Sequence, residues 1–169
     1  MRAGKLIAVA TVAIAIGSAP IRAGDRKPEK IGQLGAATVG STFEEVRNYK
    51  PGKGCLIENG QADCMFTDSN GVEFIVFGKN VTTVTATSRS KSALGVLPFG
   101  LEFGDTLSSA AAKLTTTAKY QWLLSSDHAG GLALTSTRDF QGRNGWTFRV
   151  ELRFTDDKLV EIRYNTQGV

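Results

Sequence analysis

The residues best suited to catalysis lie together in one short segment that contains the only histidine of the chain, Ser125-Ser126-Asp127-His128. Serine hydrolases need a nucleophile, a base and an orienting carboxylate, and this segment holds all three residue types. However, the members of such a triad meet through the fold and not through adjacency in the sequence, so a solvated loop histidine is favoured. Glycine-rich phosphate loops and metal-ligand spacings do not occur in the sequence. We therefore predict no catalytic residue, no cofactor and no metal site. A hydrolase that uses His128 ranks third, behind the two binding hypotheses given at the end of this section.

The two cysteines of the chain, Cys55 and Cys64, indicate a different kind of chemistry. They flank an Asn59-Gly60 pair, which favours the two-residue type I′ turn of a β-hairpin. Counting outwards from that turn, Cys55 faces Cys64 at a non-hydrogen-bonded pair, where Cα atoms lie about 4.5 Å apart and a disulfide can form. The spacing lacks the second ligand pair that a zinc site needs. We predict a structural disulfide that stabilises this hairpin by about 2–3 kcal/mol and suits an exported protein.

Residues 1–23 have the layout of a secretory signal peptide. Arg2 and Lys5 give a basic start, residues 6–16 form an apolar run, and residues 20–23 follow as a cleavage site with small residues. About 20 apolar residues are needed to span a bilayer, so the run is short for an uncleaved membrane anchor, which is the alternative. We expect cleavage, no stable membrane anchor afterwards, and a mobile mature terminus over the charged residues 24–30.

Cleavage would also change the charge balance of the protein. The full chain carries a formal net charge of +4, and the loss of Arg2, Lys5 and Arg22 removes three of those charges and leaves +1. A mature protein with a net charge near zero lacks the excess of basic residues that is typical of nucleic-acid-binding proteins. We therefore exclude nucleic acid as the partner.

One short motif occurs twice, as Gly40-Ser41-Thr42 and as Gly104-Asp105-Thr106. Each copy precedes a helix-sized stretch with an apolar stripe, and β-branched and aromatic segments follow each stretch. In the first copy Ser41 and Glu44 fit a reciprocal capping box. This order predicts an α+β fold of two tandem repeats, each a helix followed by an antiparallel sheet of about four strands.

The predicted boundaries follow from turn signals between these segments. Repeat 1 covers residues 31–87, a polar linker covers residues 88–95, and repeat 2 covers residues 96–169. Periodicity does not decide whether residues 120–125 form a strand or a helical turn.

The last two predicted strands carry a face of alternating charges. If residues 156–158 form a three-residue loop, Arg153 faces Glu161, Glu151 faces Arg163, and the apolar residues share the other face. The charged side chains form either a solvated ladder or a docking face with arginine anchors. The candidate partner-binding residues on this face are Arg149, Glu151, Arg153 and Arg163.

Several of these features together resemble the β-lactamase inhibitory protein family and, more loosely, the small outer-membrane lipoproteins of the β-barrel assembly machinery. The residues that carry the resemblance are Gly40–Val46, the hairpin Cys55–Cys64, Phe77-Gly78, Gly104-Asp105-Thr106 and Arg153–Val160. The resemblance implies two repeats whose sheets form a concave surface with the helices behind it. It also implies that a turn aspartate after the first hairpin contacts the partner. The matching turn begins at Asp68, which we add to the candidate partner-binding residues.

The sequence therefore predicts an exported, non-enzymatic protein-binding module, periplasmic or secreted from a bacterium. The expected partner is another protein in the periplasm or the extracellular space, and an inhibited hydrolase such as a β-lactamase is one such partner. The alternative is an accessory protein of envelope or outer-membrane assembly.

Overall fold

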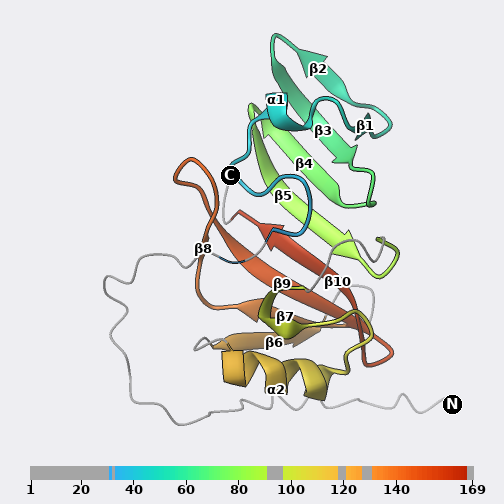
Figure 1. The fold of residues 1–169 in the computed structure, drawn as a ribbon, viewed down its shortest axis with the longest axis vertical. Helices are drawn as coiled ribbons and strands as arrows, with labels where there is room; N and C mark the ends of the chain where they lie inside the picture. The colour runs from blue at the N-terminus through green and yellow to red at the C-terminus, as the bar shows by residue number, and fades with distance from the viewer. Residues whose placement is uncertain (1–30, 32, 91–96, 118–120, 127–130, 167–169) are drawn as a thin grey trace, which may run out of the picture.

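Figure 1 shows the computed structural model, which describes residues 31, 33–90, 97–117, 121–126 and 131–166. The predicted signal peptide and mature terminus, part of the predicted linker, and His128 lie outside the described residues. Within the part of the chain that is described, no helix combines the length and the apolarity needed to cross a membrane.

One antiparallel sheet of ten strands makes up most of the fold (Figure 1). Its path runs β1-β3-β4-β5-β10-β9-β7-β6, with β2 paired to β3 and β8 paired to β9. In chain order the elements are α1 (Phe43–Val46), β1 (Lys50–Pro51), β2 (Leu56–Glu58), β3 (Gln61–Thr67), β4 (Glu73–Gly78), β5 (Asn80–Thr87), the 3-10 helix η2 (Pro98–Gly100), α2 (Leu107–Thr117), β6 (Trp122–Ser126), β7 (Leu132–Ser136), β8 (Phe140–Gln141), β9 (Thr147–Thr155) and β10 (Lys158–Asn165). Of the segment left open between strand and helix, residues 122–125 lie in the strand β6, and residue 120 lies outside the described residues.

The predicted α+β fold of two helix-plus-sheet repeats is wrong, because the strands of both halves belong to a single sheet. β5 pairs with β10 from Glu161 opposite Thr87 to Asn165 opposite Thr83. Left unpaired, each strand would expose a row of backbone N–H and C=O groups, and pairing with each other satisfies both rows. The first predicted helix is also reduced to the single turn α1, because the chain enters a strand at Lys50–Pro51. Only α2, with eleven residues, is a helix of ordinary length among the described elements.

Both copies of the glycine-threonine motif bind the start of a strand in the same way. Gly40 N–H donates to Val81 C=O at 2.8 Å, and Val81 N–H donates to Ser41 C=O at 2.8 Å. Likewise Gly104 N–H donates to Leu159 C=O at 2.9 Å, and Leu159 N–H donates to Asp105 C=O at 2.8 Å. The repeated residues therefore correspond to a repeated local contact, although the strands that follow form one sheet.

The cap of α1 lies one residue later than predicted. Thr42 is the N-cap, and its backbone N–H donates to the carboxylate of Glu45 at 2.7 Å. Ser41 is buried and its hydroxyl accepts the N–H of Thr38 instead. The predicted pair of Ser41 with Glu44 is thus wrong, because Ser41 is already held in the turn that precedes the helix.

The cysteine hairpin has the predicted register. Asn59 and Gly60 both have positive φ, as a type I′ turn requires. Leu56 lies opposite Asp63 in this hairpin. Cys55 and Cys64 form a disulfide with their Cα atoms 4.8 Å apart, which confirms the prediction and fits an oxidising compartment.

The last hairpin differs from the prediction at its turn. Asp156 and Asp157 alone form the turn, both with positive φ, so that Lys158 lies opposite Thr155. A bulge between Leu159 and Glu161 then adds the residue that the shorter turn leaves out. Beyond the bulge the predicted pairs are confirmed, with Glu161 opposite Arg153 and Arg163 opposite Glu151. The need to keep apolar residues on one face is met by a bulge and not by a longer loop.

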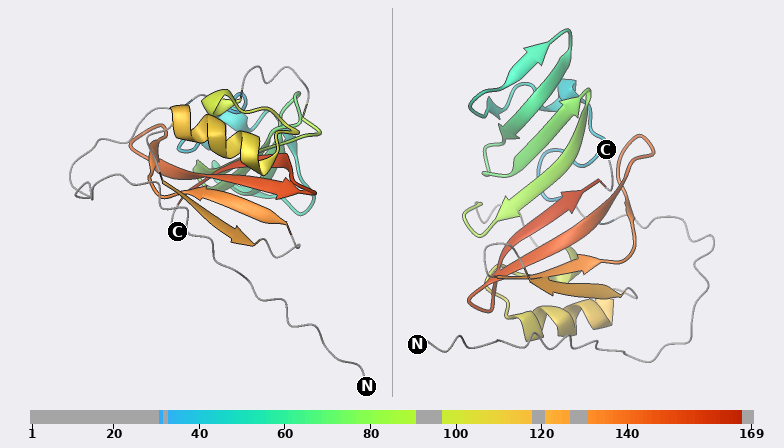
Figure 2. Two further views of the ribbon diagram at one scale, coloured as in Figure 1. Left: turned by 90° about the horizontal axis from the view of Figure 1, so that it is seen from below. Right: turned by 180° about the vertical axis from the view of Figure 1, so that it is seen from behind.

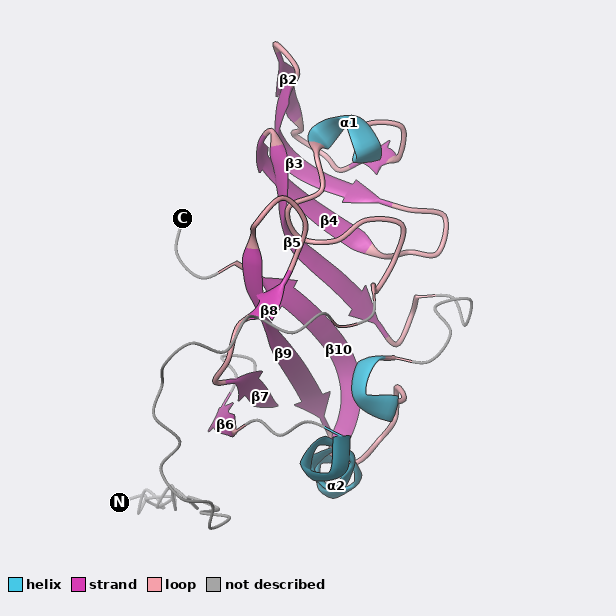
Figure 3. Cartoon of the chain, turned by 60° about the vertical axis from the view of Figure 1, so that its left-hand side comes forward, coloured by secondary structure: helices cyan, strands magenta, loops and turns pink. Residues whose placement is uncertain are grey.

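The core lies on one face of the sheet. α1 packs against β3 and β4, while α2 packs against η2 and β10; Figure 3 shows both helices beside the sheet. Phe66, Phe74 and Leu152 are fully buried beneath them. The Tyr164 ring stacks on Phe148 with ring centroids 4.5 Å apart, and burial raises the pKa of Tyr164 well above its usual range. Figure 2 (right) views the sheet from the other side, with α1 behind it. We call this other side the open face.

The carboxylate of Asp105 holds the chain together at the start of α2, where Asp157 also accepts the Leu107 N–H at 3.2 Å. The Asp105 carboxylate accepts the Glu102 N–H at 2.8 Å, the Ser109 hydroxyl at 3.1 Å and the Lys113 ammonium at 2.9 Å. Burial alone would raise the pKa of Asp105, but the hydrogen bonds from Lys113, Glu102 and Ser109 and the charge of Lys113 outweigh burial and lower it. Folding therefore favours the ionised form of this group.

We expect Asp105 to make stability depend on pH under acidic conditions. Its folded-state pKa lies below the unfolded value of 3.8, so its contribution is complete above the unfolded pKa and is lost as the pH falls through the folded pKa. Asp105→Asn should lower the free energy of unfolding by about 1–3 kcal/mol at neutral pH and by less in acid. Urea denaturation at a series of pH values measures both effects. Asp63→Asn, at an exposed position of β3, is the control, and an equal loss for Asp105→Asn at every pH would contradict the assignment.

Candidate functional site

Four large apolar side chains gather on the open face of the first half of the sheet. Strand alternation directs Phe66, Phe74 and Val76 into the core and their neighbours to the other side. Cross-strand pairing then places Leu56 and Phe77 on either side of Asp63, and Met65 opposite Ile75. The exposed fractions are 66% for Leu56, 37% for Met65, 43% for Ile75 and 55% for Phe77. We call Leu56, Met65, Ile75 and Phe77 the apolar quartet.

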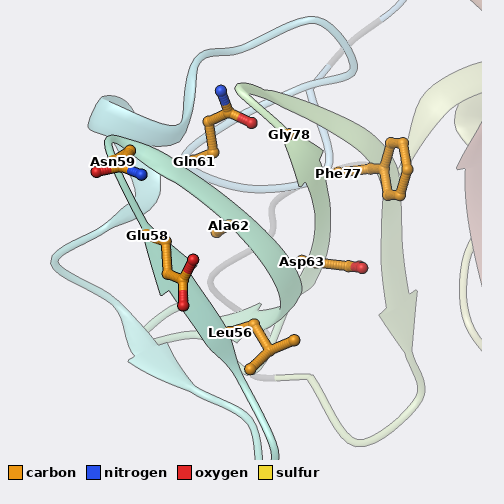
Figure 4. Close-up of a pocket in the computed structure, with 8 residues that line it drawn as sticks. All are labelled: Leu56, Glu58, Asn59, Gln61, Ala62, Asp63, Phe77 and Gly78. Atoms are coloured by element: carbon orange, nitrogen blue, oxygen red, sulfur yellow. The ribbon is translucent and has the colours of Figure 1, made fainter.

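A shallow groove of about 420 Å³ adjoins the apolar quartet at the tip of the cysteine hairpin (Figure 4). Leu56 and Phe77 of the quartet contribute to its lining, and so do the carboxylates Glu58 and Asp63. The β2–β3 turn positions this lining, and the disulfide fixes β2 against β3. The remaining lining residues are Asn59, Gln61, Ala62 and Gly78. The lining of the groove therefore combines apolar side chains with two negative charges.

The predicted charged residues lie on the same open face, over β9 and β10. Arg163 Nη2 lies 2.8 Å and Arg153 Nη1 lies 3.5 Å from Glu161 Oε1, and Arg153 Nε lies 3.7 Å from Glu151 Oε1. Arg149 lies at the end of this row, and its Nε donates to Asp139 Oδ1 at 3.1 Å. We call Arg149, Glu151, Arg153, Glu161 and Arg163 the arginine ladder. Its charges are largely compensated by one another, so it presents hydrogen-bonding groups more than net charge.

Short hydroxyl side chains of β5 separate the quartet from the ladder. Thr83 lies opposite both Ile75 of the quartet and Asn165, and Thr85 lies opposite Arg163 of the ladder. The Thr83 hydroxyl donates to Asn165 Oδ1 at 2.9 Å. Both threonines are nearly buried, so the longer neighbours enclose them. The quartet and the ladder are thus two distinct areas of one continuous face.

No protein-family model matches this chain, and no curated protein or solved structure matches it either. The surface must therefore be interpreted through its own chemistry. Among the described residues there is no group of three or more His, Cys, Asp or Glu side chains placed to hold a metal ion.

Asp68 lies away from the quartet and serves the fold. Its side chain is only 7% exposed. Its Oδ1 accepts the N–H groups of Asn70 at 2.8 Å and Val72 at 3.0 Å, and its Oδ2 accepts the N–H of Ala36 at 3.5 Å. The carboxylate thus closes the β3–β4 turn and attaches the preceding loop to it. Its partner-binding role stays a prediction from the resemblance, and we leave Asp68 out of the candidate surface.

Sequence reasoning missed the apolar quartet. In β4 the residues Phe74, Ile75, Val76 and Phe77 are all large and apolar, so alternation cannot tell the core face from the exposed one. That continuous run was the available signal, because a strand covered on one side only should alternate with polar residues. An apolar outer face on such a strand marks a surface that is covered by something else.

Proposed function

We propose that the protein is an exported, non-enzymatic binding module that holds another protein against the open face of its sheet. The apolar quartet carries this proposal. Its four side chains are between 37% and 66% exposed and adjacent on one face, which is what the core of a protein interface requires. The disulfide supports a site of action in the periplasm or outside the cell, in line with the leader pattern at residues 1–23.

The groove beside the quartet suggests the chemistry of the partner. Glu58 and Asp63 border Leu56 and Phe77 there. A complementary segment would carry apolar side chains for the quartet and Lys or Arg side chains for the two carboxylates. The arginine ladder would lie at the rim, where its guanidinium groups can donate hydrogen bonds to a partner without adding much net charge.

Inhibition of a hydrolase such as a β-lactamase, and service in outer-membrane assembly, stay predictions from the resemblance. Both would require an interface like the proposed one, and they differ in the identity of the partner. One experiment therefore tests the binding role and distinguishes the two predicted partners, provided that it identifies the protein that is bound.

Site-specific photocrosslinking tests this proposal. A photoreactive residue at Ile75 or Phe77 should yield an adduct with a partner protein in the cells that export the chain, and mass spectrometry identifies that protein. Ile57 is the matched control, because it is 49% exposed but lies opposite Ala62, on the other side of the same hairpin. With the purified partner, Ile75→Glu should weaken binding at least about tenfold, which is 1.4 kcal/mol, while Ile57→Glu should not. Adducts that form at Ile57 alone, or at no quartet position, would contradict the proposal.

A further inference from the structure

The two edges of the sheet are built differently. At one end lie β1 and β2, with two and three residues; β1 consists of Lys50 and Pro51, and the disulfide attaches the start of β2 to β3. Short strands, lysine and proline all hinder the pairing of an edge with another chain. At the other end β6 (Trp122–Ser126) has five residues, with no charged residue, no proline and no shift in its register with β7. β6 therefore lacks every one of these protective features.

The outer backbone groups of β6 can be assigned from its pairing with β7. Thr137 N–H donates to Gln121 C=O at 3.0 Å, so this pair is hydrogen-bonded. Because hydrogen-bonded and non-hydrogen-bonded pairs alternate in antiparallel strands, Leu123 and Ser125 also bond to β7. The N–H and C=O groups of Trp122, Leu124 and Ser126 consequently point away from β7. Among the described strands, β6 pairs with β7 alone.

We propose that β6 pairs antiparallel with β6 of a second copy of this chain, across a two-fold axis at Leu124. In this register Leu124 lies opposite Leu124 of the second copy, and Trp122 of each copy lies opposite Ser126 of the other. All the outward groups named above then find partners, in up to about six N–H···O=C bonds. The two sheets become continuous, and each keeps its open face on the same side.

Charge and apolar exposure favour a second copy as the occupant. Since β6 carries no charge, pairing with itself brings no like charges together, whereas a charged edge would repel its own copy. Leucines also gather at this end of the sheet: Leu123 is 61% exposed, Leu124 47% and Leu132 38%. Leu124 would become covered by its counterpart. This association uses the edge of the sheet and leaves the apolar quartet, at the other end, accessible.

Sedimentation velocity of the mature protein over a range of about 1–200 μM tests the proposal. The wild type should dimerise reversibly. Leu124→Lys places two ammonium groups opposite each other, and Leu124→Pro removes an outward N–H that β7 does not use; each should weaken dimerisation at least about tenfold. Leu56→Lys, at a more exposed leucine on the opposite end of the sheet, should not change it.

Amide hydrogen exchange of the wild type keeps the test decisive if either Leu124 variant fails to fold. The N–H groups of Trp122, Leu124 and Ser126 should become protected as the concentration rises, while those of Leu123 and Ser125 should be protected throughout. A wild type that stays monomeric over the whole range would overturn the proposal. So would a dimer that Leu56→Lys disrupts and the Leu124 variants leave intact, because such a dimer would use the open face.

Discussion

Gly40→Ala is expected to lower the free energy of unfolding by about 3 kcal/mol or more, because the backbone at Gly40 packs directly against the distant loop that holds Arg143. The φ of Gly40 is +82°, a conformation that side chains rarely adopt. A Cβ atom added there would lie 2.2 Å from the backbone oxygen of Arg143 and 2.9 Å from the Cβ of Trp146. Backbone strain and overpacking each cost about 1–3 kcal/mol, and here they act together.

The surroundings of Gly40 cannot easily move to make room. Arg143 N–H donates to Val39 C=O at 2.9 Å, and Asn144 Nδ2 donates to Gly40 C=O at 2.9 Å. An ion pair between Arg143 and Glu45 connects the same loop to α1. The loop between β8 and β9 is thus fastened to the segment that enters the first half of the sheet. Together with the pairing of β5 and β10, this contact joins the two halves of the sheet.

Gly104→Ala is the matched control for this prediction. Gly104 occupies the same place in the second copy of the motif and also has a positive φ, +95°, but an added Cβ would meet nothing within 4 Å. Its substitution should cost only the conformational strain, about 1–2 kcal/mol. Urea denaturation of the two variants measures the difference. Equal losses would mean that the contact with Arg143 is relaxed in solution and that the positive φ alone selects glycine at both positions.

Local features of the sequence were predictable because few residues decide them. The Asn59-Gly60 pair determines its turn and register without help from the rest of the chain, and so the Cys55–Cys64 disulfide followed. The pairing of charges on β9 and β10 was predictable for a related reason, since only one register separates apolar from charged residues. The two-residue turn at Asp156 was not, because a bulge can restore the same register from a shorter turn.

The pairing of β5 with β10 was beyond prediction from the sequence. Thr83 and Thr87 meet Asn165 and Glu161 across a long separation in the chain, and no local signal states which strand will cover which edge. The two copies of one motif therefore suggested two separate sheets. The apolar quartet was hidden for another reason: Ile75 and Phe77 are indistinguishable by type from the core residues beside them, and only the fold assigns them to the outside.

Asp68→Ala is the second substitution with a large expected effect, a loss of about 2–4 kcal/mol in the free energy of unfolding. The change would leave the N–H groups of Asn70, Val72 and Ala36 without their acceptor; the bond from Val72 is buried and the other two are partly buried. Each buried donor left unsatisfied costs about 1–3 kcal/mol, and water admitted to the vacated space would recover part of that cost. Asp68→Asn keeps one acceptor oxygen and should lose less. Ser69→Ala, at an exposed position in the same turn, should stay within about 0.5 kcal/mol of the wild type.

The same variants separate a structural role of Asp68 from the partner-binding role that the resemblance implies. If the carboxylate acts only within the fold, Asp68→Asn protein that is still folded should bind the crosslinked partner as the wild type does, and its deficit should appear in urea denaturation alone. If the carboxylate also reaches the partner, binding by the folded Asp68→Asn protein should weaken in addition to its loss in the free energy of unfolding. The second outcome would require Asp68, now 7% exposed, to leave its turn on binding, and the N–H groups of Asn70 and Val72 would then exchange faster in the complex than in the free protein.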